Sequence, residues 1–361
     1  MKVCVLTHNL DTKNGGGRMA YELVGSMRKA NPDIEMVVLT TAGSNCRFEK
    51  PIIFSNKLRL LFHWRKIRQI FRQSDLIHAL DGFPYGFIAT FLSFGLKRKK
   101  IITLVGSGSI KPLYNFWQFF LVKWAYKKAD KLTAISSYTA QEVKKMIPDL
   151  EIEVINLGIN LDRFLFQKAD QEIAKSGRYI LSVGRLKPRK GYLESIKVFS
   201  EVNKHFPDLK YVIVGSGDGK YFQKMLESIK NLNLTDKVIF KKNISDDDLV
   251  SLYQGAELFI LLSQNDNYDI EGFGLVFLEA AAFGLPVISS KNCGAQDAIL
   301  DKENGFLVDP KNLREAAESI LLILNNQSLR ERFSEKSKKF AKQMSWQKVV
   351  VKYADIYRSL L

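Results

Sequence analysis

The stretch LFILLSQNDNYDIEGFGLVFLEAAAFGLPVISS, residues 258–290, predicts two strands joined by a loop and a helix. An apolar run at 258–263 predicts the first strand, and a polar, glycine-containing loop follows at 264–274. A helix is expected over 275–284 and a second apolar strand at 285–290. Two strands connected through a helix are typical of a parallel sheet.

The same alternation of strands and helices extends through the chain, whose 361 residues suggest about two domains. Such alternation predicts parallel sheets covered by helices on both faces, and thus an α/β fold class with two doubly wound, Rossmann-like domains. Ligands of these sheets bind beyond the carboxyl ends of the strands, so we expect a site in a cleft between the domains. The other expected strands are 2–7, 34–40, 75–80, 100–105, 131–136, 178–184, 209–217, 237–242 and 305–309.

The domain boundaries are predicted from one polar segment, FQKADQEIAKSGR, which separates the two halves. We expect an N-terminal domain over 1–165, a linker at 166–177 and a C-terminal domain over 178–343. The tail, 344–361, has apolar residues at helical spacing and is expected to form one amphipathic packing helix.

The composition is that of a folded globular protein, with 46% hydrophobic and 25% charged residues. No uninterrupted apolar run is long enough to span a membrane, and the start lacks the features of a signal peptide. The three cysteines and four histidines are scattered, so neither a disulfide framework nor a protein-held metal is expected, and a reducing cytoplasm fits.

The charge is unevenly distributed along the chain. Of a net charge of +16, residues 1–165 carry +12 and the remainder +4. This asymmetry suggests an anionic partner for the first half, such as a lipid surface, a phosphorylated acceptor or nucleic acid.

Three glycine-containing loops could hold a phosphate group. In GRLKPRKG, residues 184–191, Arg185 and Lys190 are among four cations between two glycines; the alternative is a solvated basic turn. The triplet Gly15, Gly16 and Gly17 precedes a helix and could bind an anion there, or be a flexible connection. A third such turn, beginning at Gly215, does not complete a GxGxxG pattern.

A fourth candidate is the stretch EGFGLVFLE, residues 271–279, at the start of the expected helix over 275–284. Free backbone N–H groups and the helix dipole favour an anion at a helix start. Glu271 and Glu279 flank this position and could accept hydrogen bonds from hydroxyls on either side of a diphosphate. The alternative is a helix-capping acid and an incidental surface acid. The expected N–H donors are those of Gly272, Phe273, Gly274, Leu275 and Val276.

Together these residues resemble retaining glycosyltransferases of the GT-B fold, especially family 4. EGFGLVFLE matches the E-x7-E motif of that family, and GRLKPRKG is similar to its donor-phosphate loop. NLGINLDRF at 156–164, ENGFLVD at 303–309 and SWQKVVVKYADIY at 345–357 are similar to its interdomain segment, late strand and closing helix. The resemblance covers nearly the whole chain in order.

The resemblance implies a role for each motif residue. Arg185 and Lys190 would neutralise the donor diphosphate, and Glu279 would bind the ribose. Glu271 would contact the transferred sugar near the reacting carbon. The base would lie near Lys242 to Ile244, held largely by backbone, and the last helix would cross back to the first domain.

The sequence departs from the family pattern at three positions. Val105 stands in TLVG where family members often have a histidine that contacts the donor sugar or the acceptor. Asn160 replaces an acidic residue, and Asp297 replaces a glutamate. These departures concern the identity of the donor and leave the class unchanged.

The function expected from the resemblance is transfer of a sugar, with retention, from a UDP- or GDP-linked donor to a glycan or lipid-linked acceptor, without a metal or other cofactor. Cell-surface polysaccharide or lipopolysaccharide biosynthesis is the expected pathway. One alternative is a non-catalytic GT-B scaffold subunit, although the glutamate pair is intact. Another is a nucleic-acid-binding protein, but no zinc finger, RRM signature or basic heptad run supports it.

A peripheral contact with the inner face of the cytoplasmic membrane is expected from residues 57–73. Basic flanks beside an apolar helical stripe suit an anionic bilayer. A second aromatic-rich segment with a basic end lies at 113–128. The alternative is a helix packed in the core with solvated arginines. The stripe of 57–73 comprises Leu60, Trp64, Ile67 and Phe71, with Arg65, Arg68 and Arg72 beside it.

Overall fold

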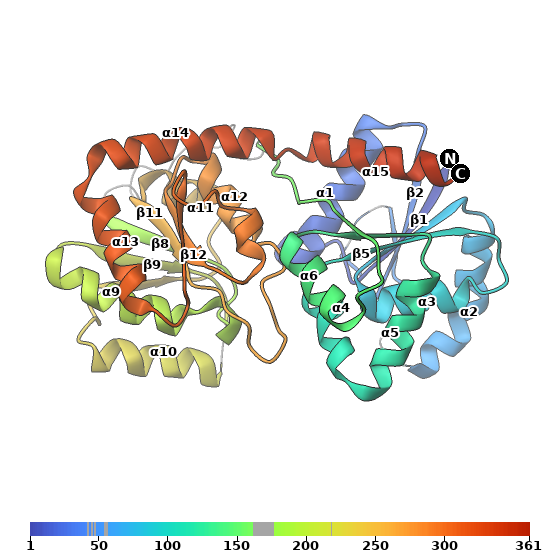
Figure 1. Cartoon of the computed structure of the whole chain (residues 1–361), viewed down its shortest axis with the longest axis horizontal. Coiled ribbons are helices and arrows are strands. Elements are labelled where there is room, and N and C mark those ends of the chain that lie inside the picture. Colours follow the sequence, from blue (N-terminus) through green and yellow to red (C-terminus); the bar gives the residue numbers. More distant parts are fainter. Residues whose placement is uncertain (42, 45, 47, 54–56, 162–176, 218) are drawn as a thin grey trace. The chain divides into compact units, whose positions relative to one another are not determined.

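The computed structural model describes residues 1–361 except 42, 45, 47, 54–56, 162–176 and 218 (Figure 1). The chain divides into two compact units. The first unit comprises Met1–Gly158 and Ser345–Leu361, and the second comprises Ile159–Met344. Of the linker expected at 166–177, residues 166–176 lie outside the described residues.

The first unit contains a parallel sheet with the strand order β3-β2-β1-β4-β5-β6-β7. The strands are β1 (Lys2–Thr7), β2 (Glu35–Thr40), β3 (Glu49–Lys50), β4 (Leu76–Leu80), β5 (Lys99–Leu104), β6 (Lys131–Ala134) and β7 (Ile152–Val154). The helices are α1 (Gly15–Ala30), α2 (Lys57–Arg72), η1 (Gly82–Gly86), α3 (Phe87–Leu92), α4 (Ser107–Ile110), η2 (Lys111–Tyr114), α5 (Phe116–Lys128), α6 (Ser137–Met146) and α15 (Trp346–Leu360).

The second unit repeats this plan, with the strand order β10-β9-β8-β11-β12-β13 and parallel pairing throughout. Its strands are β8 (Tyr179–Val183), β9 (Lys210–Val214), β10 (Val238–Lys241), β11 (Leu258–Leu261), β12 (Val287–Ser290) and β13 (Gly305–Val308). Its helices are η3 (Pro188–Lys190), α9 (Tyr192–His205), α10 (Lys220–Asn231), α11 (Asp246–Gly255), α12 (Leu275–Ala282), η4 (Gly294–Asp297), α13 (Leu313–Asn325) and α14 (Gln327–Gln343).

The central strands of both sheets are buried along their whole length, because helices cover both faces. The predicted α/β class with two Rossmann-like domains is therefore confirmed. The strand–helix–strand unit expected over 258–290 is present as β11, α12 and β12. The short strands β3 and β7 were not predicted, because two or three residues carry too little periodicity to be recognised.

The helix at 57–73 is present as α2, but two of the four residues in its apolar stripe face the core. The side chains of Ile67 and Phe71 are fully buried, so this part of the stripe belongs to the core. Arg68 donates hydrogen bonds to the carbonyl oxygens of Leu92 and Phe94, at 2.8 and 2.9 Å, and thereby holds the end of α3. The expectation that this stripe meets a bilayer is therefore wrong for Ile67 and Phe71.

The last helix, α15, packs in the first unit beside α1 (Figure 1). Two of its tyrosines reach the sheet. Tyr357 Oη lies 2.7 Å from His78 Nδ1, and Thr103 Oγ1 lies 2.7 Å from His78 Nε2. Tyr353 Oη lies 3.2 Å from Thr103 Oγ1. This buried polar network joins residues that are more than 200 positions apart in the sequence.

We predict that His78 makes the first unit less stable as the pH falls. Burial lowers the pKa of His78 to about 3, whereas an unfolded histidine titrates near about 6.5. Between these values the unfolded chain binds the extra proton, so stability decreases by up to about 1.4 kcal/mol per pH unit. Thermal unfolding at pH 7.5 and pH 5.5 measures this loss. His78→Gln should lose less stability over the interval than wild type, and equal losses would contradict the assignment.

Candidate functional site

The candidate site lies in the second unit, where its strand order reverses between β8 and β11. Chain segments leave these two adjacent strands in opposite directions, which opens a crevice at their carboxyl ends. The basic loop 184–191 follows β8, and the loop 262–274, with Glu271 near its end, follows β11. Two of the sequence-predicted motifs therefore meet at one edge of the sheet.

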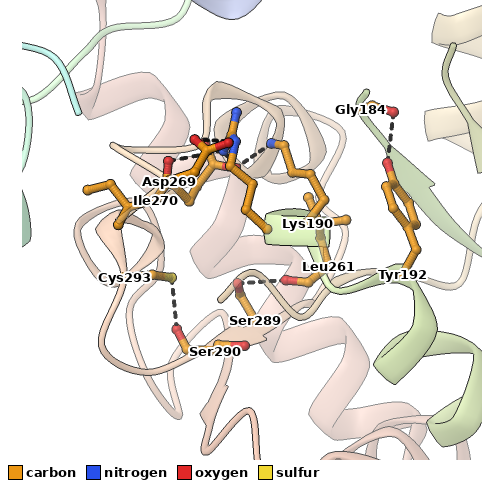
Figure 2. Close-up of polar contacts among 11 residues, drawn as sticks. Gly184, Lys190, Tyr192, Leu261, Asp269, Ile270, Ser289, Ser290 and Cys293 are labelled. Carbon is orange, nitrogen blue, oxygen red and sulfur yellow. Dashed lines mark hydrogen bonds and ion pairs between the residues drawn. The ribbon is translucent and has the colours of Figure 1, made fainter. Parts of the chain in front are cut away.

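The loop 184–191 is held in a fixed conformation by contacts at both ends. Tyr192 Oη donates a hydrogen bond to the Gly184 carbonyl oxygen at 2.8 Å (Figure 2). Gly191 has a φ of 66°, and a Cβ at this position would lie 1.7 Å from the Leu262 carbonyl oxygen. Only glycine fits there, and its absent side chain lets the loop after β8 lie directly against the end of β11.

Lys190 and Glu271 form a buried ion pair across the two loops. Lys190 Nζ bonds to Glu271 Oε2, and only 7% of Lys190 and 6% of Glu271 are exposed. Arg189 contacts the same oxygen through its guanidinium at 3.1 Å and also reaches Asp269 at 3.3 Å. The Lys190 side chain points toward the segment of Asp269 and Ile270 (Figure 2). One carboxylate oxygen is thus held by two cations.

The electrostatics of Glu271 follow from this arrangement. Burial alone would raise the pKa of its carboxyl, but Lys190 and then Arg189 lower the pKa more, so the net value lies below the usual one. Glu271 is therefore ionised at neutral pH. The site presents a fixed carboxylate and two fixed cations within a few ångströms of one another.

Arg185 is placed differently from Lys190, although both lie in the same loop. Its side chain is exposed and forms no hydrogen bond or ion pair with any residue that the structure describes. Arg189 occupies the position beside Glu271 instead. The sequence contained Arg189 in the basic loop, but nothing in its spacing distinguished it from Arg185.

The start of α12 supplies backbone donors next to Glu271. Gly274, with a φ of 85°, precedes the helix and accepts a hydrogen bond from Phe277 N at 3.0 Å. The N–H groups of Leu275 and Val276 have no backbone acceptor among the described residues, as expected for a first helical turn. Gly272 and Phe273 form the approach to the helix, and Phe273 is buried.

Glu279 lies inside α12 and has a partner that the sequence did not reveal. Tyr253 Oη donates a hydrogen bond to Glu279 Oε2 at 2.9 Å, and only 4% of Glu279 is exposed. The Tyr253 ring stacks on Phe283 at 5.3 Å, which fixes the hydroxyl. Glu279 is therefore no incidental surface acid. Tyr253 lies 26 positions away in the sequence, so no local motif could have identified it.

The remaining predicted residues have varied surroundings. Gly215 follows β9, and a Cβ on it would lie 1.9 Å from the Gly184 carbonyl oxygen, so close packing already requires a glycine there. Ile244 follows β10 and is half-buried. Residues 15–17 belong to the first unit, at the start of α1. Gly17 N is already bonded to Asn14 Oδ1 at 2.8 Å, which leaves Gly15 and Gly16 as the candidate donors of the triplet.

No group of three or more histidine, cysteine, aspartate or glutamate side chains in the described part of the chain is placed to hold a metal ion. The polar groups gathered beyond β8 and β11 are cations, the carboxylates of Glu271 and Asp269, and backbone N–H groups. Such a set can bind an anion and a polyhydroxyl compound side by side.

The chain matches two protein families along its length. Residues 13–163 match Glycosyltransferase Family 4, and residues 164–340 match Glycosyl transferases group 1. An uncharacterised glycosyltransferase of Haemophilus influenzae is 28% identical, with 98% of this chain and 99% of that protein covered. A GDP-mannose-dependent phosphatidylinositol monomannoside mannosyltransferase of Mycolicibacterium smegmatis is 29% identical over about half of each chain.

Solved structures share this fold over the whole chain. Anabaena HepE, in a crystal structure with UDP, superposes with a TM-score of 0.82. The two chains are 19% identical, and the match covers 99% of this chain and 100% of that one.

Proposed function

The chain belongs to the GT-B glycosyltransferases of family 4, and we propose from this membership that it transfers a sugar from a UDP- or GDP-linked donor with retention of configuration. The observation that carries the proposal is the buried contact between Lys190 and Glu271. In a nucleotide sugar the phosphate oxygen is bonded directly to the anomeric carbon. A cation for the phosphate and a carboxylate for the sugar must therefore be neighbours.

The donor would lie along the carboxyl edge of the second sheet. Lys190 and Arg185 would contact the diphosphate, together with the N–H groups at the start of α12. Glu271 would face the sugar, Glu279 would hold the ribose, and the base would lie near Ile244. Structures of Anabaena HepE with UDP and with UDP-glucose support a nucleotide-sugar donor.

The mechanism follows from where charge develops. The bond between the anomeric carbon and the phosphate oxygen breaks, and the diphosphate leaves with the electron pair. Cations and helix N–H groups that already point at this oxygen stabilise its charge, and each well-placed donor contributes about 3–4 kcal/mol. The acceptor oxygen then bonds to the anomeric carbon from the same face. Its proton passes to the departing phosphate oxygen, so no protein base is required.

The proposed acceptor is a glycan or a lipid-linked glycan in cell-surface polysaccharide or lipopolysaccharide biosynthesis, and the proposed location is the cytoplasmic face of a membrane. The excess positive charge of residues 1–165 supports an anionic partner. The name of the Mycolicibacterium relative includes a phosphatidylinositol mannoside, which is a lipid acceptor. Within the described residues, no helix combines the length and apolar character needed to cross a membrane.

We expect Glu271 and Glu279 to affect different kinetic constants. Glu271→Gln should lower kcat by at least about tenfold more than it raises KM, because the carboxylate meets the sugar as positive charge develops. Glu279→Gln should chiefly raise KM for the donor, because ribose is held equally in the ground and transition states. Steady-state kinetics of both variants with one confirmed donor provide the measurement. The same modest change in both would show that the reacting carbon lies elsewhere.

Arg185 should matter far more than its neighbour Lys187, although both are exposed cations of one loop. If Arg185 supplies a preorganised donor to the diphosphate, Arg185→Ala should lower turnover by roughly 100- to 1000-fold. Lys187→Ala is the matched control and should stay within about twofold of wild type. Equal turnover in the two variants would remove Arg185 from the site.

We also expect turnover to be independent of metal ions, since the proposed site supplies its own positive charge through lysine, arginine and helix N–H groups. Initial rates before and after prolonged treatment with excess EDTA test this. Activity lost with EDTA and restored by magnesium or manganese would show that a metal, and not the protein, neutralises the leaving group.

A further inference from the structure

An aromatic surface on the first unit has no role in the site described above. Six large side chains there are between 40% and 77% exposed, which is unusual for residues of this size. They belong to α5, to α3 and to Phe94, which lies two residues after the end of α3. We call this surface the α3–α5 aromatic face; it consists of Phe91, Phe94, Phe116, Trp117, Phe120 and Leu121.

Ring contacts join the two helices that form the face. Phe116 and Phe120, one turn apart on α5, have ring centroids 5.5 Å apart. Trp124, one turn further along, meets Phe87 of α3 at 6.2 Å, and Phe87 stacks on Phe91 at 5.7 Å. The two helices lie side by side in the first unit (Figure 1).

The side of α5 opposite the aromatic face packs against the first unit, so the outer side is not needed to hold the helix in place. Val122, Ala125 and Tyr126 are buried, and Tyr126 Oη donates a hydrogen bond to the Ser109 carbonyl oxygen at 2.9 Å. This inner side already anchors the helix to the unit. The outer aromatic residues are therefore additional to what packing requires.

Positive charge predominates along the segment that forms the face, although Lys127 is paired with Asp149, and Lys99 and Lys100 are paired with Asp130. Residues 82–129 include eight lysines and arginines and contain neither aspartate nor glutamate. Lys97, Lys111 and Lys128 are exposed and form no ion pair with any described residue. Lys128 lies at the end of α5 on the side that carries Trp117 and Leu121, four positions after Trp124 and seven positions after Leu121. Aromatic side chains bordered by free lysines suit the interface of an anionic bilayer.

We propose that the α3–α5 aromatic face inserts into the headgroup region of an anionic lipid bilayer. This inference deepens the proposed function, because it assigns the surface by which the enzyme would reach a lipid-linked acceptor. It also replaces the stripe of α2 as the membrane face, since Ile67 and Phe71 of that stripe are buried.

A bilayer fits this face better than a second copy of the chain does. In a symmetric dimer the face would meet itself, and the free lysines of one copy would oppose those of the other. Like charges placed together in an interface are unfavourable. An anionic membrane provides the opposite charge and an apolar layer for the rings at the same time.

The test uses the purified full chain and sedimentation with vesicles. Wild type should bind vesicles of phosphatidylcholine with phosphatidylglycerol, bind phosphatidylcholine alone weakly, and lose affinity as salt is raised. Trp117→Ser/Phe120→Ser should reduce affinity for the anionic vesicles about tenfold or more, because both side chains insert. Leu226→Ser/Leu322→Ser, at exposed apolar positions of the second unit, is the matched control and should bind as wild type does.

Two further measurements separate the possible outcomes. Thermal unfolding of Trp117→Ser/Phe120→Ser should match wild type, since both side chains are mostly exposed, so lost binding would not reflect misfolding. Donor hydrolysis without lipid should be unchanged in this variant. If wild type itself hydrolyses no donor, the proposed function is rejected, and vesicle binding stands as a separate result.

Two results would overturn the membrane assignment. One is equal vesicle binding by wild type and variant, and the other is a wild-type protein that is dimeric where the variant is monomeric.

Discussion

The buried ion pair of Lys190 and Glu271 constrains everything else at the edge of the second sheet. A charge removed from water is costly unless a partner of opposite charge compensates it, and both groups are more than nine-tenths buried. Among the described residues, Lys190 is paired with Glu271 alone, whereas Glu271 is also held by Arg189, so loss of Glu271 would leave the lysine buried without a counter-charge. Since Lys190 follows β8 and Glu271 follows β11, their contact fixes two loops to each other where the strand order reverses. The crevice results from the strand order of the sheet, and the ion pair places one positive and one negative group beside it.

Close backbone packing supports the same edge and changes how its glycines are interpreted. Gly191 lies against the Leu262 carbonyl group, and Gly215 lies against the Gly184 carbonyl group, with no space for a Cβ at either position. Glycines in a strand-to-helix turn are often taken to indicate a phosphate. Here the first need for them is steric, because neighbouring loops must approach within van der Waals distance before any ligand can bind. A glycine pattern alone therefore does not distinguish a binding loop from a tightly packed one.

The sequence predicted the parts of this protein that depend on local pattern. Buried parallel strands are continuous apolar runs, so β8 and β11 and the helix between β11 and β12 could be located without a structure. The pairing of side chains that are distant in the sequence could not be predicted. Nothing local indicated that Arg189, and not Arg185, would contact Glu271, or that Tyr253 would bond to Glu279. Those contacts depend on how two loops or two helices meet after folding.

The helices α2 and α5 show why periodicity is an incomplete guide to surface function. The stripe of α2 has the spacing and flanking arginines of a membrane-binding helix, yet Ile67 and Phe71 are buried and Arg68 holds backbone carbonyl groups. On α5 apolar residues occur on all sides, and no stripe stands out in the sequence. Burial separates the two sides of α5: Val122 and Tyr126 face the core, while Phe116 and Trp117 remain in solvent. An apolar stripe predicts that one side of a helix is removed from water. Whether the protein core or an external partner covers that side depends on how the helix packs in the fold.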